Sequence, residues 1–64
     1  MTSPPVAVPA RYADSGEPCV VTASAGPPAT FAVERRLVFR LGPDHCEDGG
    51  RLIRADVPGA FGRF

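Results

Sequence analysis

Residues 30–42 read TFAVERRLVFRLG, and this stretch decides the fold class of the chain. From residue 33 onward, apolar side chains fall on odd positions and charged ones on even positions: Val33, Leu37, Phe39 and Leu41 against Glu34, Arg36 and Arg40. Arg35 and Val38 are the two exceptions. A period of two is typical of a half-buried β-strand, and Val and Phe favour strands over helices. The pattern predicts one long strand over residues 30–41.

A helix over the same residues is the alternative interpretation. Val33, Leu37 and Leu41 are spaced by four, as on one face of a helix. Arg36 and Arg40 would then flank the apolar stripe, and Pro and Gly bracket the segment closely. The strand is the better prediction.

Two further segments have strand-like composition. PCVVTASA at 18–25 is rich in β-branched residues and ends at a Gly-Pro-Pro breaker, and RLIRADV at 51–57 alternates Ile53, Ala55 and Val57 with polar positions. A polar loop with turn residues at 48–50 separates 30–41 from 51–57, so these two are expected to form an antiparallel hairpin. With 18–25 the sequence predicts a mainly β fold, a small antiparallel meander of three to four strands.

The N-terminal part differs in composition from the rest. Prolines at 4, 5, 9 and 18 keep their preceding residues out of the helical region. We therefore divide the chain into an extended Pro-rich arm at 1–18 and a small β domain at 19–64. Residues 6–8 are an alternative short edge strand, and Tyr12 is a candidate anchor of the arm on a partner.

The core of a 64-residue chain is small, so we expect oligomerisation or docking on a larger partner to supplement it. Phe61 and Phe64 follow the last breaker. They either fold back over the open face of the meander or insert into a pocket on another subunit, as interface aromatics often do. The residues expected at an interface are Tyr12, Phe61, Phe64, Arg36, Arg40 and Arg54.

Charge is balanced, with seven acidic and seven basic residues. Nucleic-acid binders normally carry a basic excess, so nucleic acid is an unlikely partner. Arg36, Arg40 and Arg54 would form a local basic strip if they shared one outer face. This strip is either a weak nucleic-acid site or an ordinary solvated face with weak ion pairs.

The chemically most suggestive cluster is DHCED at 44–48. His45 and Cys46 are candidate metal ligands, since zinc is bound by His, Cys and carboxylates. Contiguous side chains do not easily surround one ion, and adjacent His and Cys on an extended chain make a poor nucleophile–base pair. We therefore expect a polar turn there, with no cofactor and no catalytic residue.

No segment approaches the roughly 18 apolar residues of a membrane span, and no secretory signal is visible. The expected compartment is the cytoplasm, where Cys19 and Cys46 stay reduced. In an oxidising compartment they could instead form a disulfide that closes a loop of about 27 residues. Arg, Ala, Gly and Pro have GC-rich codons, so we expect a bacterial origin.

These observations predict a non-catalytic accessory or structural subunit that acts by protein–protein association, in a larger assembly or as a homo-oligomer. A small metal- or thiol-dependent enzyme subunit centred on His45 and Cys46 is the first alternative. A weak nucleic-acid binder that uses the arginine face is the second.

Overall fold

The computed structural model describes residues 4–64. It contains six strands and one short 3-10 helix, in the order β1 (Val6–Tyr12), β2 (Pro18–Ser24), β3 (Thr30–Val33), β4 (Arg36–Gly42), β5 (His45–Asp48), β6 (Arg51–Ala55) and η1 (Ala60–Arg63). No α-helix occurs within this range. The mainly β prediction is confirmed.

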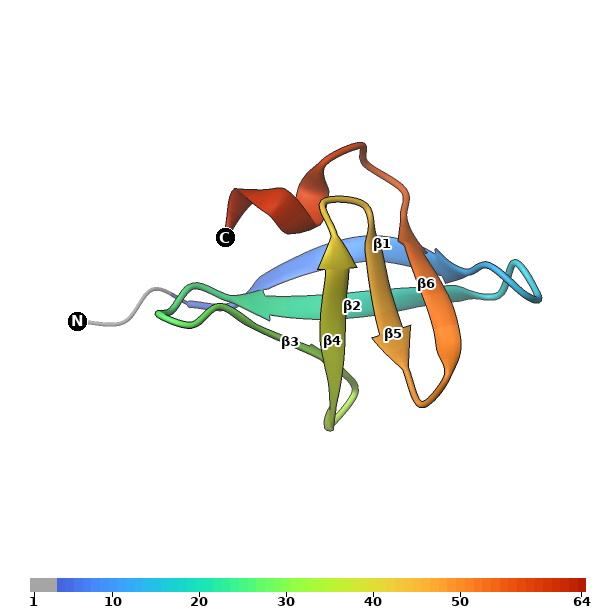
Figure 1. Ribbon diagram of the computed structural model, residues 1–64, viewed down its shortest axis with the longest axis horizontal. Coiled ribbons are helices and arrows are strands. Elements are labelled where there is room, and N and C mark those ends of the chain that lie inside the picture. Colours follow the sequence, from blue (N-terminus) through green and yellow to red (C-terminus); the bar gives the residue numbers. More distant parts are fainter. Residues whose placement is uncertain (1–3) are drawn as a thin grey trace.

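The six strands form a closed antiparallel barrel, in which each strand pairs with the next and β6 pairs back onto β1. In Figure 1 the long β1–β2 hairpin crosses β4, β5 and β6. The predicted meander of three to four strands therefore has too few strands, and the sheet is closed rather than open. A closed sheet leaves no open face for a partner to cover, because its interior is filled by its own side chains.

The stretch predicted as one strand is a hairpin. β3 and β4 pair with Val33 opposite Arg36, so Glu34 and Arg35 make a two-residue turn. Glu34 adopts a left-handed conformation with φ 58°, which tight hairpin turns require but Glu rarely adopts. The absence of Gly or Asn at this position explains why the sequence gives no turn signal here.

The turn reverses the expected orientation of β4. Val38, the exception in the alternating pattern, is buried at 4% exposure and pairs with the buried Phe31. Because side chains alternate along a strand, Arg36 and Arg40 share the side of Val38. The apolar odd positions of β4 point outward.

Residues expected to be a polar loop contain β5, which pairs with β4 on one side and β6 on the other. The predicted direct hairpin between 30–41 and 51–57 is therefore wrong. The turn at 48–50 is confirmed: Asp48 pairs with Arg51 across Gly49 and Gly50, which both have positive φ. Glycine adopts this conformation without the steric cost of a Cβ.

The segment expected to be an extended arm contributes β1, which pairs with both β2 and β6. Pro9 does not disrupt the sheet, because β6 pairs with β1 only from Ala10 onward. The Pro9 carbonyl accepts a hydrogen bond from Asp56 N at 2.9 Å, so this side of the strand needs no donor from Pro9. Residues 1–3 of the expected arm lie outside the described residues.

One end of the barrel is closed by η1, which lies over the end of β4 in Figure 1. Phe61 is fully buried and packs edge-to-face on Phe31, with ring centroids 5.8 Å apart. Phe64 contacts the same ring at 6.0 Å and is half-buried. Of the two roles considered for these aromatics, the fold-back role describes their position here. We call Phe31, Phe61 and Phe64 the aromatic plug.

Within residues 4–64 no helix has the length and apolar character needed to cross a membrane.

Candidate functional site

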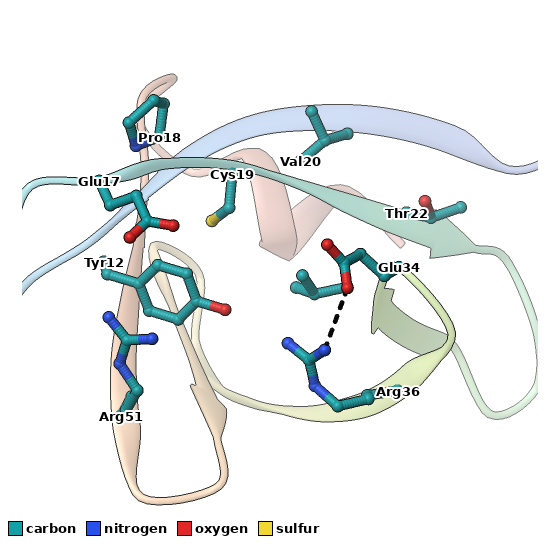
Figure 2. Close-up of a pocket in the computed structure, with 10 residues that line it drawn as sticks. Tyr12, Glu17, Pro18, Cys19, Val20, Thr22, Glu34, Arg36 and Arg51 are labelled. Carbon is teal, nitrogen blue, oxygen red and sulfur yellow. Dashed lines mark hydrogen bonds and ion pairs between the residues drawn. The ribbon is translucent and has the colours of Figure 1, made fainter.

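The end of the barrel opposite the aromatic plug is a polar mouth with a hollow of about 540 Å³. Strand ends and the β3–β4 turn line it with ten residues: Tyr12, Glu17, Pro18, Cys19, Val20, Thr22, Val33, Glu34, Arg36 and Arg51. Figure 2 shows the Cys19 thiol directed into this mouth, near Tyr12. The mouth is therefore the first candidate for a catalytic or ligand-binding site.

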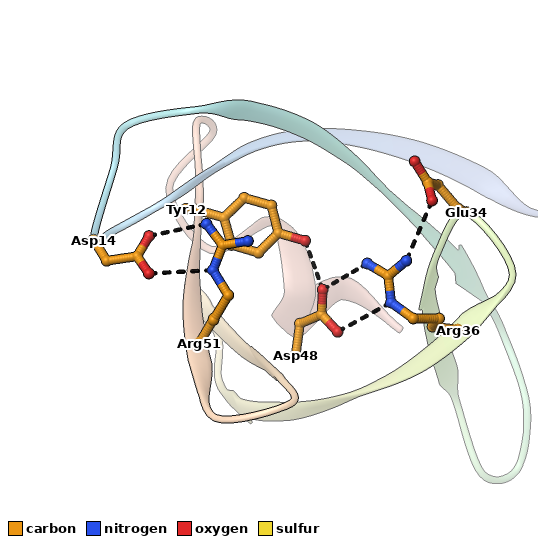
Figure 3. Close-up of polar contacts among 6 residues, drawn as sticks. All are labelled: Tyr12, Asp14, Glu34, Arg36, Asp48 and Arg51. Carbon is orange, nitrogen blue, oxygen red and sulfur yellow. Dashed lines mark hydrogen bonds and ion pairs between the residues drawn. The ribbon is translucent and has the colours of Figure 1, made fainter.

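Asp48 organises the polar contacts at the mouth. Its carboxylate accepts a hydrogen bond from the Tyr12 hydroxyl at 2.5 Å and from Arg36 Nη2 at 2.9 Å. Arg36 also donates to Glu34 at 3.2 Å. Asp48 at the end of β5 pairs with Arg51 at the start of β6, so the Asp48 carboxylate lies between Arg51 and Arg36 (Figure 3).

Arg51 is held in the same way. Its guanidinium donates to Asp14 at 3.1 and 3.2 Å and lies 3.8 Å above the Tyr12 ring. Each arginine of the mouth is therefore matched with at least one carboxylate. Among residues 4–64, the mouth therefore offers an anionic ligand no arginine that lacks a carboxylate partner.

The titration behaviour of these groups does not favour catalysis. The hydrogen bond to Asp48 and burial raise the pKa of Tyr12, which keeps the hydroxyl neutral at physiological pH. Hydrogen bonds from Arg36 and Tyr12 lower the pKa of Asp48, which makes it a weaker base. A general acid or base works best with a pKa near the operating pH, and both shifts go the other way.

Both cysteines are free thiols in the structure. Burial raises the pKa of Cys46 to about 11. The pKa of Cys19 is also raised, mainly by burial and to a smaller extent by nearby carboxylates. The thiolate is the reactive form, so both environments suppress nucleophilic and redox reactivity.

His45 and Cys46, the candidate metal ligands, lie on opposite sides of β5. Cys46 is fully buried and pairs with the buried Ile53, whereas His45 pairs with the exposed Arg54 on the outer side. Neighbouring residues on a strand point in opposite directions, so the two side chains do not converge on one ion. No cluster of three or more potential ligands occurs in the described part of the chain.

The three arginines expected to form one basic strip are not brought together. Arg36 contacts Asp48 at the mouth, and Arg40 donates to the Phe61 carbonyl at 2.9 Å beside the aromatic plug. Only Arg54 lies on the outer face, because it follows the buried Ile53 on β6. The reversed orientation of β4 is the physical reason.

Two other expected interface residues are part of the core. Tyr12 is 5% exposed and Phe61 is fully buried, so neither is available on the surface of the folded chain as an anchor. Phe64 remains half-exposed. Tyr12 and Phe61 are therefore core residues of the barrel, and an interface role of Phe64 stays a prediction.

The largest exposed apolar side chains lie on the outward side of β4. Leu37, Phe39 and Leu41 are 70%, 68% and 58% exposed and occupy alternate positions of one strand. We call these three residues the β4 face. Scattered apolar residues are normal on protein surfaces, but a contiguous row on one strand is typical of an interaction site.

A groove of about 320 Å³ runs beside Phe39, where β3 and β4 diverge. Leu37, Phe39 and Arg40 line it together with the buried Phe31 and Val38. Glu47 of β5 lies on the other side of Phe39, directly opposite it in the sheet. The β4 face is thus a ridge with a groove on one side and a carboxylate on the other.

Sequence reasoning assigned the β4 face to the core, because it assumed that one uninterrupted strand joins Val33 to Leu41. One signal pointed the other way. Four apolar residues occur among residues 37–41, and a half-buried strand of that length buries only two or three of them.

Comparison with models of known protein families, with curated proteins and with solved structures finds no match to this chain.

Proposed function

We propose that this chain is a non-catalytic association module that binds protein through the β4 face. The observation that carries the proposal is the row of Leu37, Phe39 and Leu41, each more than half exposed on one strand. Association with a partner removes this apolar surface from water, which lowers the free energy of the complex.

The size of the face supports the same function. Three large side chains about two-thirds exposed present roughly 400 Å² of apolar surface, which lies in the range of functional patches on small proteins. The chemistry of the mouth and of the thiols, described above, favours neither an enzyme nor an anion-binding site.

In-cell photo-crosslinking tests the proposal. A benzophenone amino acid is placed at Leu41 in cells that express the chain, and at Val20 as a matched control, since Val20 is 53% exposed on β2. We expect a discrete protein adduct from position 41 that disappears when Phe39→Ser is added, and no such adduct from position 20.

The adduct counts for the proposal whether it contains a second copy or another protein. Absence of any adduct from position 41, or equal adducts from both positions, would contradict it. Circular dichroism of each purified variant shows that the barrel is retained.

A further inference from the structure

We infer that the β4 face binds a second copy of this chain, so that two barrels associate through the same surface on each. The inference rests on the proposed function and names the partner. An interface with two-fold symmetry requires one patch that is complementary to itself. The β4 face and its surroundings have this property in both shape and charge.

The shape argument comes from Phe39 and the groove beside it. Phe39 projects from the middle of β4 with 68% of its surface exposed. The adjoining groove of about 320 Å³ is lined by apolar side chains, among them Phe31 and Leu37, and is large enough to admit a phenyl ring. A projecting aromatic and a matching groove therefore lie side by side on one surface.

The charge argument comes from the residues on either side of Phe39. Glu47 lies on the β5 side, opposite Phe39, and Arg40 lines the groove on the β3 side. Neither takes part in the four ion pairs found within residues 4–64. Arg40 donates one hydrogen bond to the Phe61 carbonyl and lies over the Phe31 ring, so it is held at the plug end of the groove without a carboxylate partner. The patch thus carries one negative and one positive charge that have no ion-pair partner, Glu47 on the β5 side of Phe39 and Arg40 in the groove.

A two-fold axis that is parallel to β4 and lies between Phe39 and the groove satisfies both arguments. It places the β5 side of each copy against the β3 side of the other, so that Phe39 of each copy meets the groove of its partner. The same operation turns Glu47 of one copy toward the side that carries Arg40 of the other. Opposite charges then face each other, which fixes the register of the pair.

The available area sets the expected strength. The roughly 400 Å² of the β4 face is about half of the roughly 800 Å² that each partner contributes to a standard stable interface. A weak, reversible dimer is therefore expected rather than a permanent one.

Sedimentation velocity of the purified, reduced chain from about 5 μM to 1 mM tests this inference. We expect a monomer–dimer equilibrium whose dissociation constant rises at least tenfold in Phe39→Ser and changes less than twofold in Val20→Ser. A chain that stays monomeric at 1 mM, or a dimer that Phe39→Ser does not weaken, overturns the inference.

A charge exchange tests the symmetry. Glu47→Arg places like charges opposite each other and is expected to weaken the dimer at least tenfold, whereas adding Arg40→Glu to it restores association to within threefold of the wild type. If Arg40→Glu unfolds the chain, Glu47→Arg and Glu47→Gln decide: no weakening by either overturns the proposed register.

The crosslinking result separates the two proposals, since a monomeric chain that still gives a position-41 adduct with another protein retains the proposed function and loses only this inference.

Discussion

At the mouth, charged and hydroxyl groups are bonded to one another, whereas at the other end of the barrel the aromatic plug excludes water with three phenyl rings. At the mouth, Asp48 accepts hydrogen bonds from Tyr12 and Arg36, and at the plug Phe61 packs on Phe31. Burial of a large aromatic contributes more free energy than a partly exposed ion pair. The comparison indicates that the plug stabilises the fold and that the mouth mainly sets its geometry and pH response.

The largest expected effect is at the plug. Phe61→Ala removes a fully buried ring and leaves a cavity, at a cost of about 3–5 kcal/mol of unfolding free energy. A domain of this size has only about 3–10 kcal/mol in total, so this single change is expected to remove about a third of the stability or more. Urea titration followed by circular dichroism measures this loss.

Two milder substitutions keep the plug test interpretable. Phe61→Leu retains most of the apolar volume and should cost less than about 1.5 kcal/mol. Phe64→Ala should cost less than Phe61→Ala, because Phe64 is only half-buried. If Phe64→Ala were the more damaging of the two alanine variants, our assignment of Phe61 as the centre of the plug would be wrong.

A smaller effect is expected at the mouth. Asp48→Ala leaves the part-buried Tyr12 hydroxyl without its carboxylate acceptor and should lower the unfolding free energy by about 1–3 kcal/mol. Glu34→Ala is the matched control, since its side chain is 80% exposed and its ion pair with Arg36 contributes little. Equal losses in the two variants would show that Asp48 does not organise the mouth.

The two ends should also respond differently to acid. Arg36 and Tyr12 hold the pKa of Asp48 below its ordinary value near 4. Its contribution is therefore fully present above about pH 4 and is lost as the pH falls through the lower pKa of the folded state. Between pH 6 and pH 2 the difference in unfolding free energy between wild type and Asp48→Asn should shrink, while that between wild type and Phe64→Ala stays constant.

Urea titrations at several pH values measure both differences. A constant difference for Asp48→Asn across this range would mean that the charge of Asp48 does not contribute to stability. A difference for Phe64→Ala that shrinks in parallel would mean that acid acts on the whole barrel rather than on the mouth.

The sequence predicts the mainly β class and the glycine turn, and physical reasons explain why it misses the number and pairing of the strands. Val20, Val21 and Thr22 identify β2, and Gly49-Gly50 identifies the β5–β6 turn, because these residue types have strong local preferences. β5 escapes detection, since its four residues HCED include none of the strand-favouring residues Val, Ile, Thr, Phe, Tyr and Trp. Its strand conformation comes from pairing with β4 and β6, which is a non-local effect.

The candidate site was missed for a related reason. Which face of a strand is buried depends on register, and a shift by one residue exchanges the two faces. The turn at Glu34 and Arg35 provides that shift, so the Leu37, Phe39 and Leu41 row moves from the expected core to the surface. Residues 6–8 were predicted only as an alternative short edge strand and Phe61 and Phe64 as one of two possible covers, so the sequence predicted an open meander where β1 and η1 complete a closed barrel.

The smallest expected effect tests this turn directly. Glu34 has φ 58°, a conformation that Asn adopts much more readily than Glu, so Glu34→Asn should raise the unfolding free energy by about 0.5 kcal/mol. The lost ion pair with Arg36 subtracts little, because Glu34 is 80% exposed. Arg35→Asn is the matched control, since Arg35 has no positive φ and gains nothing from the change. Thermal and urea unfolding of the three proteins measures the difference.

A loss of stability in Glu34→Asn comparable to that in Arg35→Asn would mean that the ion pair outweighs the backbone strain. A gain confined to Glu34→Asn would support the left-handed turn that turns the apolar side of β4 outward and creates the proposed interface.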